Sequence, residues 1–432
     1  MQASQIMLAV AALACGSAAF AAPATSRIAL SAGASAIQGN LTLAIRSLCV
    51  APNVPTTFAS GNFTTVVCAN GAVTGGSVGP TSYGGKPDAD FRNFAGLPYA
   101  EFRVNVANGS FGNVQILNPA LNPAFTFRDP ETGTNIAAPA GAVIVGGAND
   151  VEPSAFPSAT IGANTLFTTA NVGIAQVFGV AASNLLYNAM FAEQKASGVL
   201  PASCNQGDTN LSYCIPTIGK AQMATIMADN PFNSAYVRGV GFLAGSALDG
   251  TELRYARRVD TSGTQASAQN YFLGLPCSKA ALSIVPEPTT DDEAGGLKDE
   301  LRSAIRVMAA GGTSDVRAEL NKQALYVIGV MSGENNQTGQ FWKWLRVNGV
   351  AIGENATPGS AGITNSNTMK NGSYDFYFET TSMGGNATGD AFWAVVNGAL
   401  NTLPAPVGLV NNNDLSTGYT KTGSTCAGSS SN

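Results

Sequence analysis

Histidine is missing from this 432-residue sequence. Without an imidazole the chain can form neither a Ser-His-Asp triad nor a Cys-His pair, and it lacks the commonest protein ligand of zinc and iron. One Gly-x-Ser-x-Gly match occurs at residues 75–79 (GGSVG), but its serine has no histidine partner, so we interpret this segment as a loop. No carboxylate cluster has the spacing of metal ligands. We therefore expect a protein that is not an enzyme and that uses no metal and no cofactor.

Charged side chains are scarce too, at 11% of the residues, and the net charge is −5. No block of lysine and arginine is present, so the electrostatic basis for binding nucleic acid is absent. An acidic protein can still bind an anion when backbone N–H groups and helix termini supply the positive potential locally. Hydrophobic residues make up 45%, and this length suits two domains of roughly 150–200 residues each.

The start of the chain has the features of an export signal. Residues 6–21 (IMLAVAALACGSAAFA) form an apolar run too short for a membrane span, and the run ends in the small-residue pattern Ala19-Phe20-Ala21. We therefore predict a signal peptide over residues 1–21 and a periplasmic or secreted protein. No Lys or Arg precedes Arg27, which a start further upstream would explain. The alternative is a lipid anchor on Cys15.

Cysteine is sparse but even in number once the signal is removed. An even count in an exported chain favours disulfides. Short loops make Cys49–Cys68 and Cys204–Cys214 the natural pairs, which leaves Cys277 and Cys426 for each other. Other pairings stay open. No Cys-x-x-Cys spacing occurs, so redox or metal use is not expected.

Predicted strands alternate with predicted helices along most of the chain, which indicates α/β lobes with largely parallel sheets. Residues 50–90 lack a helical period and are interpreted as an insertion of loops and hairpins. An acidic loop is predicted over residues 286–296. The strands are expected at residues 27–31, 101–106, 142–145, 173–180 and 253–259, and the helices at 37–48, 113–117, 218–227, 265–273 and 297–310.

Small-residue turns recur where these strands lead into helices, at Ala34-Ser35, Gly109-Ser110, Asn149-Asp150 and Ser262-Gly263-Thr264. Each alone is an ordinary helix cap. Together their hydroxyl and N–H groups can surround a tetrahedral oxyanion without adding charge. Arg258 supplies a planar, permanently charged donor, and Asp260 is placed to hold its guanidinium.

Asp150 narrows the choice of anion. A carboxylate beside a bound anion repels it unless the ligand carries a proton to donate. Protonated forms of phosphate can do so, whereas fully ionised sulfate cannot, so an acceptor in the site discriminates between them. The alternative is that Asp150 caps a turn before Glu152-Pro153.

Residues 258–264 (RVDTSGT), together with Gly33-Ala34-Ser35, the loop at 109–112 (GSFG) and Asp150, resemble the phosphate-binding protein of the bacterial high-affinity phosphate ABC transporter. The resemblance implies the type 2 periplasmic-binding-protein fold, which has two α/β lobes, a ligand cleft and two hinge crossovers. It implies lobe 1 over residues 22–175, lobe 2 over 176–370 and a return to lobe 1 over 371–432, with crossovers near 173–180 and 368–378. The phosphate-binding residues it implies are Ser35, Ala36, Ser110 and Asp150 from lobe 1, and Arg258, Ser262, Gly263 and Thr264 from lobe 2.

The chain departs from that family at three places. Ala36 stands where an aromatic residue is common, Asn149 stands where serine is common, and the stretch between Ser35 and Ser110 is longer than usual. We expect a monomeric solute-binding protein that binds phosphate, or a similar protonated oxyanion, for uptake by an ABC permease. The alternatives are a secreted or surface phosphate binder without a transport role, a phosphoester hydrolase and an adhesin-like protein.

Overall fold

The computed structural model describes residues 27–73, 88–118, 121, 124–130, 132–156, 169–208, 211–229, 238–275, 283–293, 296–353, 367–404, 408–411 and 414–415. The predicted signal peptide with Cys15, the loop at 75–79, Cys277 and Cys426 lie outside these residues. Within the described ranges, no helix is both long enough and apolar enough to cross a membrane.

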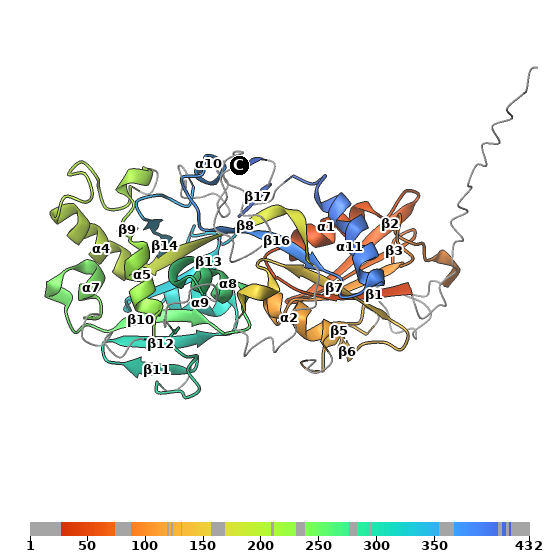
Figure 1. Ribbon diagram of the computed structural model, residues 1–432, viewed down its shortest axis with the longest axis horizontal. Helices are drawn as coiled ribbons and strands as arrows, with labels where there is room; N and C mark the ends of the chain where they lie inside the picture. Colours follow the sequence, from red (N-terminus) through yellow and green to blue (C-terminus); the bar gives the residue numbers. More distant parts are fainter. Residues whose placement is uncertain are drawn as a thin grey trace, which may run out of the picture.

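The protein is a mixed α/β structure built on one 13-stranded sheet that runs the length of the molecule (Figure 1). β14 (Trp342–Trp344) and β17 (Leu409–Asn411) pair with β8 outside the main strand order. That order is β11 (Asp299–Arg302), β12 (Ile305–Ala310), β10 (Leu253–Arg258), β13 (Val327–Ser332), β8 (Thr169–Ser183), β16 (Tyr377–Met383), β7 (Val143–Asn149), β1 (Ile28–Ala32), β4 (Glu101–Asn105), β3 (Phe63–Asn70) and β2 (Asn53–Ser60).

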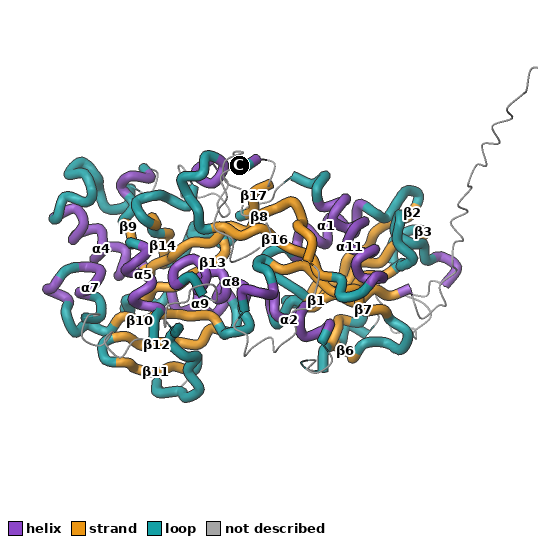
Figure 2. Tube along the Cα trace, viewed as in Figure 1, coloured by secondary structure: helices purple, strands orange, loops and turns teal. Residues whose placement is uncertain are grey.

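Helices flank this sheet along both halves of the molecule (Figure 2). Two small ladders stand apart from it, β5 (Thr126–Arg128) with β6 (Asn135–Ala137), and β9 (Thr217–Ile218) with β15 (Arg346–Val347). The helices are α1 (Gln38–Ser47), α2 (Gly109–Leu117), α4 (Asn184–Ala196), α5 (Lys220–Met227), α7 (Gly241–Ala244), α8 (Gly263–Ala268), α9 (Thr313–Leu320), α10 (Asn367–Lys370) and α11 (Ala387–Leu400).

Two blocks of parallel strands form the halves of the sheet. β7, β1 and β4 are mutually parallel, and so are β12, β10 and β13. Between the blocks, β8 and β16 run antiparallel to each other and to their outer neighbours. Because parallel strands end at the same edge of a sheet, each block presents the residues that follow its strands along one edge.

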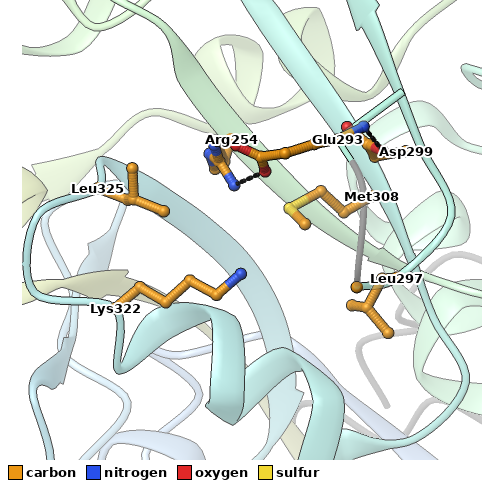
Figure 3. A pocket seen from close by; sticks show the side chains of 8 residues that line it. Arg254, Glu293, Leu297, Asp299, Met308, Lys322 and Leu325 are labelled. Atoms are coloured by element: carbon orange, nitrogen blue, oxygen red, sulfur yellow. Dashed lines mark hydrogen bonds and ion pairs between the residues drawn. The ribbon is translucent and has the colours of Figure 1, made fainter. Parts of the chain in front are cut away.

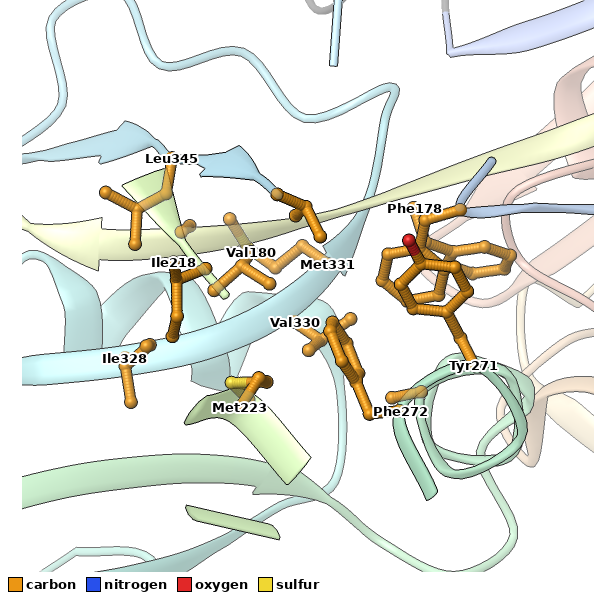
Figure 4. Close-up of a cluster of buried hydrophobic side chains, with 14 of the residues drawn as sticks. Phe178, Val180, Ile218, Met223, Tyr271, Phe272, Ile328, Val330, Met331 and Leu345 are labelled. Carbon is orange, nitrogen blue, oxygen red and sulfur yellow. The ribbon is translucent and has the colours of Figure 1, made fainter. Parts of the chain in front are cut away.

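The two largest hydrophobic cores centre on these blocks, and the larger one also takes in Phe111 and Val114 of α2. One packs α1, α11 and the face of β1 and β4, with Trp393 donating its indole N–H to the carbonyl of Val145 at 2.7 Å. The other packs β8, β13, α5 and α8, and Figure 4 shows its side chains Phe178, Val330 and Met331. Strand β8 passes from the first core to the second between Ile174 and Ala175.

The disulfides Cys49–Cys68 and Cys204–Cys214 are both present, as predicted. They suggest an oxidising location, extracellular or periplasmic. Residues 50–90 contain the predicted hairpin, formed by β2 and β3, which extends the sheet beyond β4.

The predicted helix over residues 297–310 is wrong. Its apolar residues recur at nearly helical spacing, but the segment forms the β11–β12 hairpin, and Leu301 is 46% exposed. Ser303 makes the turn at φ 58°, and Ile305 and Val307 join the buried face of β12 beside β10. Pairing with a central strand outweighs the local helical period here, because β-branched side chains suit a buried sheet.

Candidate anion-binding site

The first edge of the site follows β4 and β7. After β4, Gly109 takes a φ of 57°, and its N–H donates to the carbonyl of Val106 at 3.0 Å, which folds the chain directly into α2. The helix thus begins at Gly109, four residues earlier than predicted, so residues 109–112 form its first turn. Ser110 is fully buried in that turn, and Asp150 follows β7 and is 5% exposed.

Ser110 and Asp150 hold each other. The Ser110 hydroxyl donates to Asp150 Oδ1, and the Ser110 oxygen accepts the backbone N–H of Asp150 at 3.1 Å. Burial raises the pKa of the Asp150 carboxyl, and the Ser110 hydroxyl, the backbone N–H of Asp150 and the charge of Arg258 offset part of this rise. Asp150 therefore retains a proton more readily than an exposed aspartate does.

The second edge follows β10. The Ser262 N–H donates to the carbonyl of Val259 at 3.0 Å, and the Ser262 hydroxyl caps α8 by accepting the N–H of Gln265 at 3.4 Å. Gly263 and Thr264 occupy the first turn of α8 and are buried. The helix continues as one π-helical stretch over Gln269–Leu273.

The two edges meet at the N-termini of α2 and α8, which lie next to each other between the halves of the molecule (Figure 1). A Cβ atom on Gly263 would overlap with Asp150 Oδ1 and would lie 2.5 Å from Ser110 Oγ. A Cβ on Gly109 would lie 3.8 Å from the Cα of Ser262. The structure thus brings together Ser110, Asp150, Ser262 and Gly263 from distant parts of the sequence, and the N-termini of both helices, which carry free N–H groups and a partial positive charge, lie beside one another.

Arg258 supplies the formal charge at this edge. The residue is 8% exposed, its Nη1 donates to Thr313 Oγ1 at 2.9 Å and its Nη2 donates to the carbonyl of Gly311 at 3.2 Å. Its Nε is buried and has no hydrogen-bond partner among the described residues. Burial lowers the pKa of Arg258, while Asp150, Asp315 and Glu334 raise it in part.

Asp260 does not hold Arg258, contrary to the prediction. It pairs instead with the guanidinium of Arg257, whose side chain is fully buried. Neighbouring side chains on a strand point to opposite faces, so Arg257 and Arg258 leave β10 on different sides. The Asp260 carboxylate lies on the same side of the chain as the side chain of Arg257.

Ser35 and Ala36 are not part of the buried group. Ser35 is exposed and Ala36 is partly exposed, and α1 begins only at Gln38. The chain before them is tied to the first edge, since the Ala34 N–H donates to the carbonyl of Ala148 at 2.8 Å. Gly33 lies so close to that carbonyl that no side chain fits there.

Glu334 was missed in the sequence analysis. It follows β13 at the same edge as Arg258, and it interacts electrostatically with both Arg258 and Asp150. Its only signal was an acidic residue shortly after a buried strand, the same pattern that identified Asp150. Asn113 was also missed, and Asn149 was named only as part of the turn before Asp150; both are fully buried, and their amides have no partner among the described residues.

A separate cavity of about 300 Å³ lies at the opposite end of β10, near Arg254 (Figure 3). The buried guanidinium of Arg254 in this cavity already has carboxylate partners. It donates to Glu252 at 2.9 Å and to both oxygens of Glu293 at 2.7 and 2.8 Å. Among the described residues, no group of His, Cys, Asp and Glu is placed to hold a metal ion.

The site therefore combines two helix N-termini and the guanidinium of Arg258 with the carboxyl groups of Asp150 and Glu334. Comparison with protein-family models, curated proteins and solved structures gave no match to this chain. Any functional assignment rests on the arrangement of these side chains.

Proposed function

We propose that this protein is an exported solute-binding protein that binds phosphate, or a similar protonated oxyanion, between two lobes and delivers it to an ABC permease. The observation that carries this proposal is the meeting of the α2 and α8 N-termini over Asp150, with the unpartnered Nε of Arg258 nearby. Helix N-termini and a buried guanidinium together favour an anion.

Asp150 makes the proposal specific. Its carboxyl lies against Gly263 in the first turn of α8 and accepts the hydroxyl of Ser110, so a ligand bound there would meet a hydrogen-bond acceptor next to two helix N-termini. Phosphate and arsenate can give a proton to that acceptor, whereas sulfate cannot near neutral pH. Sulfate would leave two negative charges facing each other in a buried site, which is costly.

The proposed lobes are residues 22–175 with 371–432, and residues 176–370, in the arrangement of type 2 periplasmic-binding proteins. Supporting this division, β8 changes core between Ile174 and Ala175, and β16 pairs with β8 where the halves join. A ligand that contacts both helix termini would stabilise the closed arrangement relative to an open one, and a permease can recognise that difference.

Isothermal titration of the mature protein with phosphate, arsenate and sulfate tests the proposal. We expect phosphate and arsenate to saturate with one ion per protein molecule, and sulfate to bind at least about a hundredfold more weakly, a difference of ~2.7 kcal/mol. Absence of phosphate binding between about pH 5 and 8 would rule the proposal out. Asp150→Asn should narrow the gap between phosphate and sulfate.

A further inference from the structure

Glu334 lies at the same edge of the sheet as the arginine of the site. β10 pairs with β12 so that Arg258 lies opposite Ala310, and β10 pairs with β13 so that Ala256 lies opposite Gly329. The three parallel strands therefore end at nearly the same level. The residues that follow them are Gly311 and Thr313 after β12, Val259 after β10, and Gly333 and Glu334 after β13.

The carboxylate of Glu334 is held from the crossing strand β8. Gln176, fully buried on β8, donates its Nε2 to Glu334 Oε2 at 3.2 Å, and the Ser332 hydroxyl donates to Oε1 at 2.5 Å. The N–H of Gly333 donates to the carbonyl of Val177 at 2.8 Å, which fixes the backbone to the same strand. The backbone N–H of Glu334 also donates to this carboxylate, so three of its four acceptor positions are used and one remains for another donor.

The charges around Glu334 do not balance. Glu334 interacts electrostatically with Asp150, which follows β7, and with Arg258 at the end of β10, and Asp315 on α9 acts on the same arginine. Burial raises the pKa of Glu334, and the charge of Asp150 raises it further. With all groups ionised, two carboxylates at the site and a third on α9 would share the charge of one guanidinium. A dianion entering this group would meet net negative charge.

We propose that Glu334 is a second acceptor for the protons of the ligand, so that the site takes the doubly protonated anion in preference to the singly protonated one. This inference rests on the proposed phosphate function. One phosphate hydroxyl would donate to Asp150 and the other to Glu334, and the two remaining oxygens would accept from Arg258 and from the N-termini of α2 and α8. The bound anion then carries one negative charge instead of two, which lowers its repulsion from the carboxylates of Asp150 and Glu334.

Proton uptake on binding tests this arrangement. At about pH 8, free phosphate is mostly singly protonated, so forming the doubly protonated complex must draw about one proton from the buffer for each phosphate bound. Titration in two buffers of different ionisation enthalpy measures that number. We expect uptake of about one proton in the unaltered protein and about none in Glu334→Gln, because the neutral amide accepts the singly protonated anion.

Glu300→Gln is the control, because Glu300 lies on β11, pairs with Arg302 and is 41% exposed. It should leave the uptake unchanged. If Glu334→Gln does not fold, as judged by its circular dichroism, Glu334→Ala removes the same charge and is expected to give the same loss of uptake. Phosphate binding with equal uptake in the unaltered protein and in the Glu334 variant overturns this inference and leaves the proposed function standing. Absence of phosphate binding in the unaltered protein overturns both.

Discussion

Gly263 and Asp150 come from opposite halves of the molecule and lie in direct contact, with no space between them for a methyl group. Gly263 does not have a positive φ, so its backbone suits any residue and the requirement for glycine there is one of space. The carboxylate of one half thus touches the first turn of a helix in the other. Under the proposed function, closure of the two halves and selection of the ligand would depend on the same contact.

Gly263→Ala should lower phosphate affinity at least about tenfold, equivalent to ~1.4 kcal/mol, since the added methyl group forces the two halves apart at Asp150. Titration calorimetry measures the loss. Gly398→Ala is the matched control, because Gly398 lies in α11 with nothing within 4 Å of the new Cβ. That change should leave affinity intact and stabilise the protein by about 0.5–1 kcal/mol. Equal affinity in the two variants would contradict the contact's role.

Arg258→Lys keeps the charge but loses the planar donor set that reaches Thr313, Gly311 and the free Nε position. We expect phosphate affinity to fall by about ten- to a hundredfold, or ~1.4–2.7 kcal/mol. Arg254→Lys serves as the comparison, since Arg254 lies on the same face of β10 but at the opposite end, paired with Glu252 and Glu293. It should not change affinity. A loss of the same size in both variants would point to general damage to β10.

The ligand-free protein should become less stable, relative to Asp150→Asn, as the pH rises. The pKa of Asp150 is higher in the folded protein than in the unfolded chain. The protonated carboxyl therefore gives its full stabilisation at pH values below the ordinary pKa of an aspartate, and this stabilisation is lost as the pH rises through the raised pKa. Melting temperatures of both proteins from about pH 4 to 8 should therefore diverge in favour of the asparagine variant. Asp229→Asn, which alters an exposed carboxylate, should show no such divergence. If the melting temperatures of Asp150→Asn and of the unaltered protein change in parallel with pH, burial does not raise the pKa of Asp150.

Removing the Cys204–Cys214 disulfide should destabilise the protein without altering the site. Replacing both cysteines with serine releases a loop of 10 residues and is expected to cost about 3 kcal/mol of unfolding free energy. Both cysteines pack with Phe191 and Leu200, away from α2 and α8. Chemical denaturation gives the stability change, and phosphate titration should give the unaltered affinity. A weaker affinity would mean that this disulfide shapes the site at a distance.

The sequence predicted the parts of the site whose signal is local. A carboxylate after a buried strand identified Asp150, and small residues before a helix identified Ser110, Ser262 and Gly263. Such patterns reflect backbone geometry within a few residues, which neighbouring residues largely determine. The short disulfide loops were predictable for the same reason.

Features that depend on long-range packing were not predictable. Asp260 pairs with Arg257 because the two arginines lie on opposite faces of β10. The packing of β10 in the sheet decides which arginine occupies which face. In the sequence, Glu334 resembles any acidic loop residue. Its position is held by Gln176, which lies 158 residues away along the chain, so no local pattern marks it. Residues 297–310 formed strands because β10 offered an edge to pair with, a fact that no local window of sequence contains.

The strand order begins with β11 and finishes with β2, and both end strands resist further growth of the sheet. β2 contains Pro55, which has no N–H to offer. β11 carries the partly exposed charges of Glu300 and Arg302, and its Asp299 N–H already donates to the carbonyl of Thr290 at 2.9 Å. Prolines and charges at such positions oppose strand addition by a second molecule. A sheet of this size would otherwise be a template for fibrils. We therefore expect concentrated solutions of the folded protein to stay free of intermolecular β-structure.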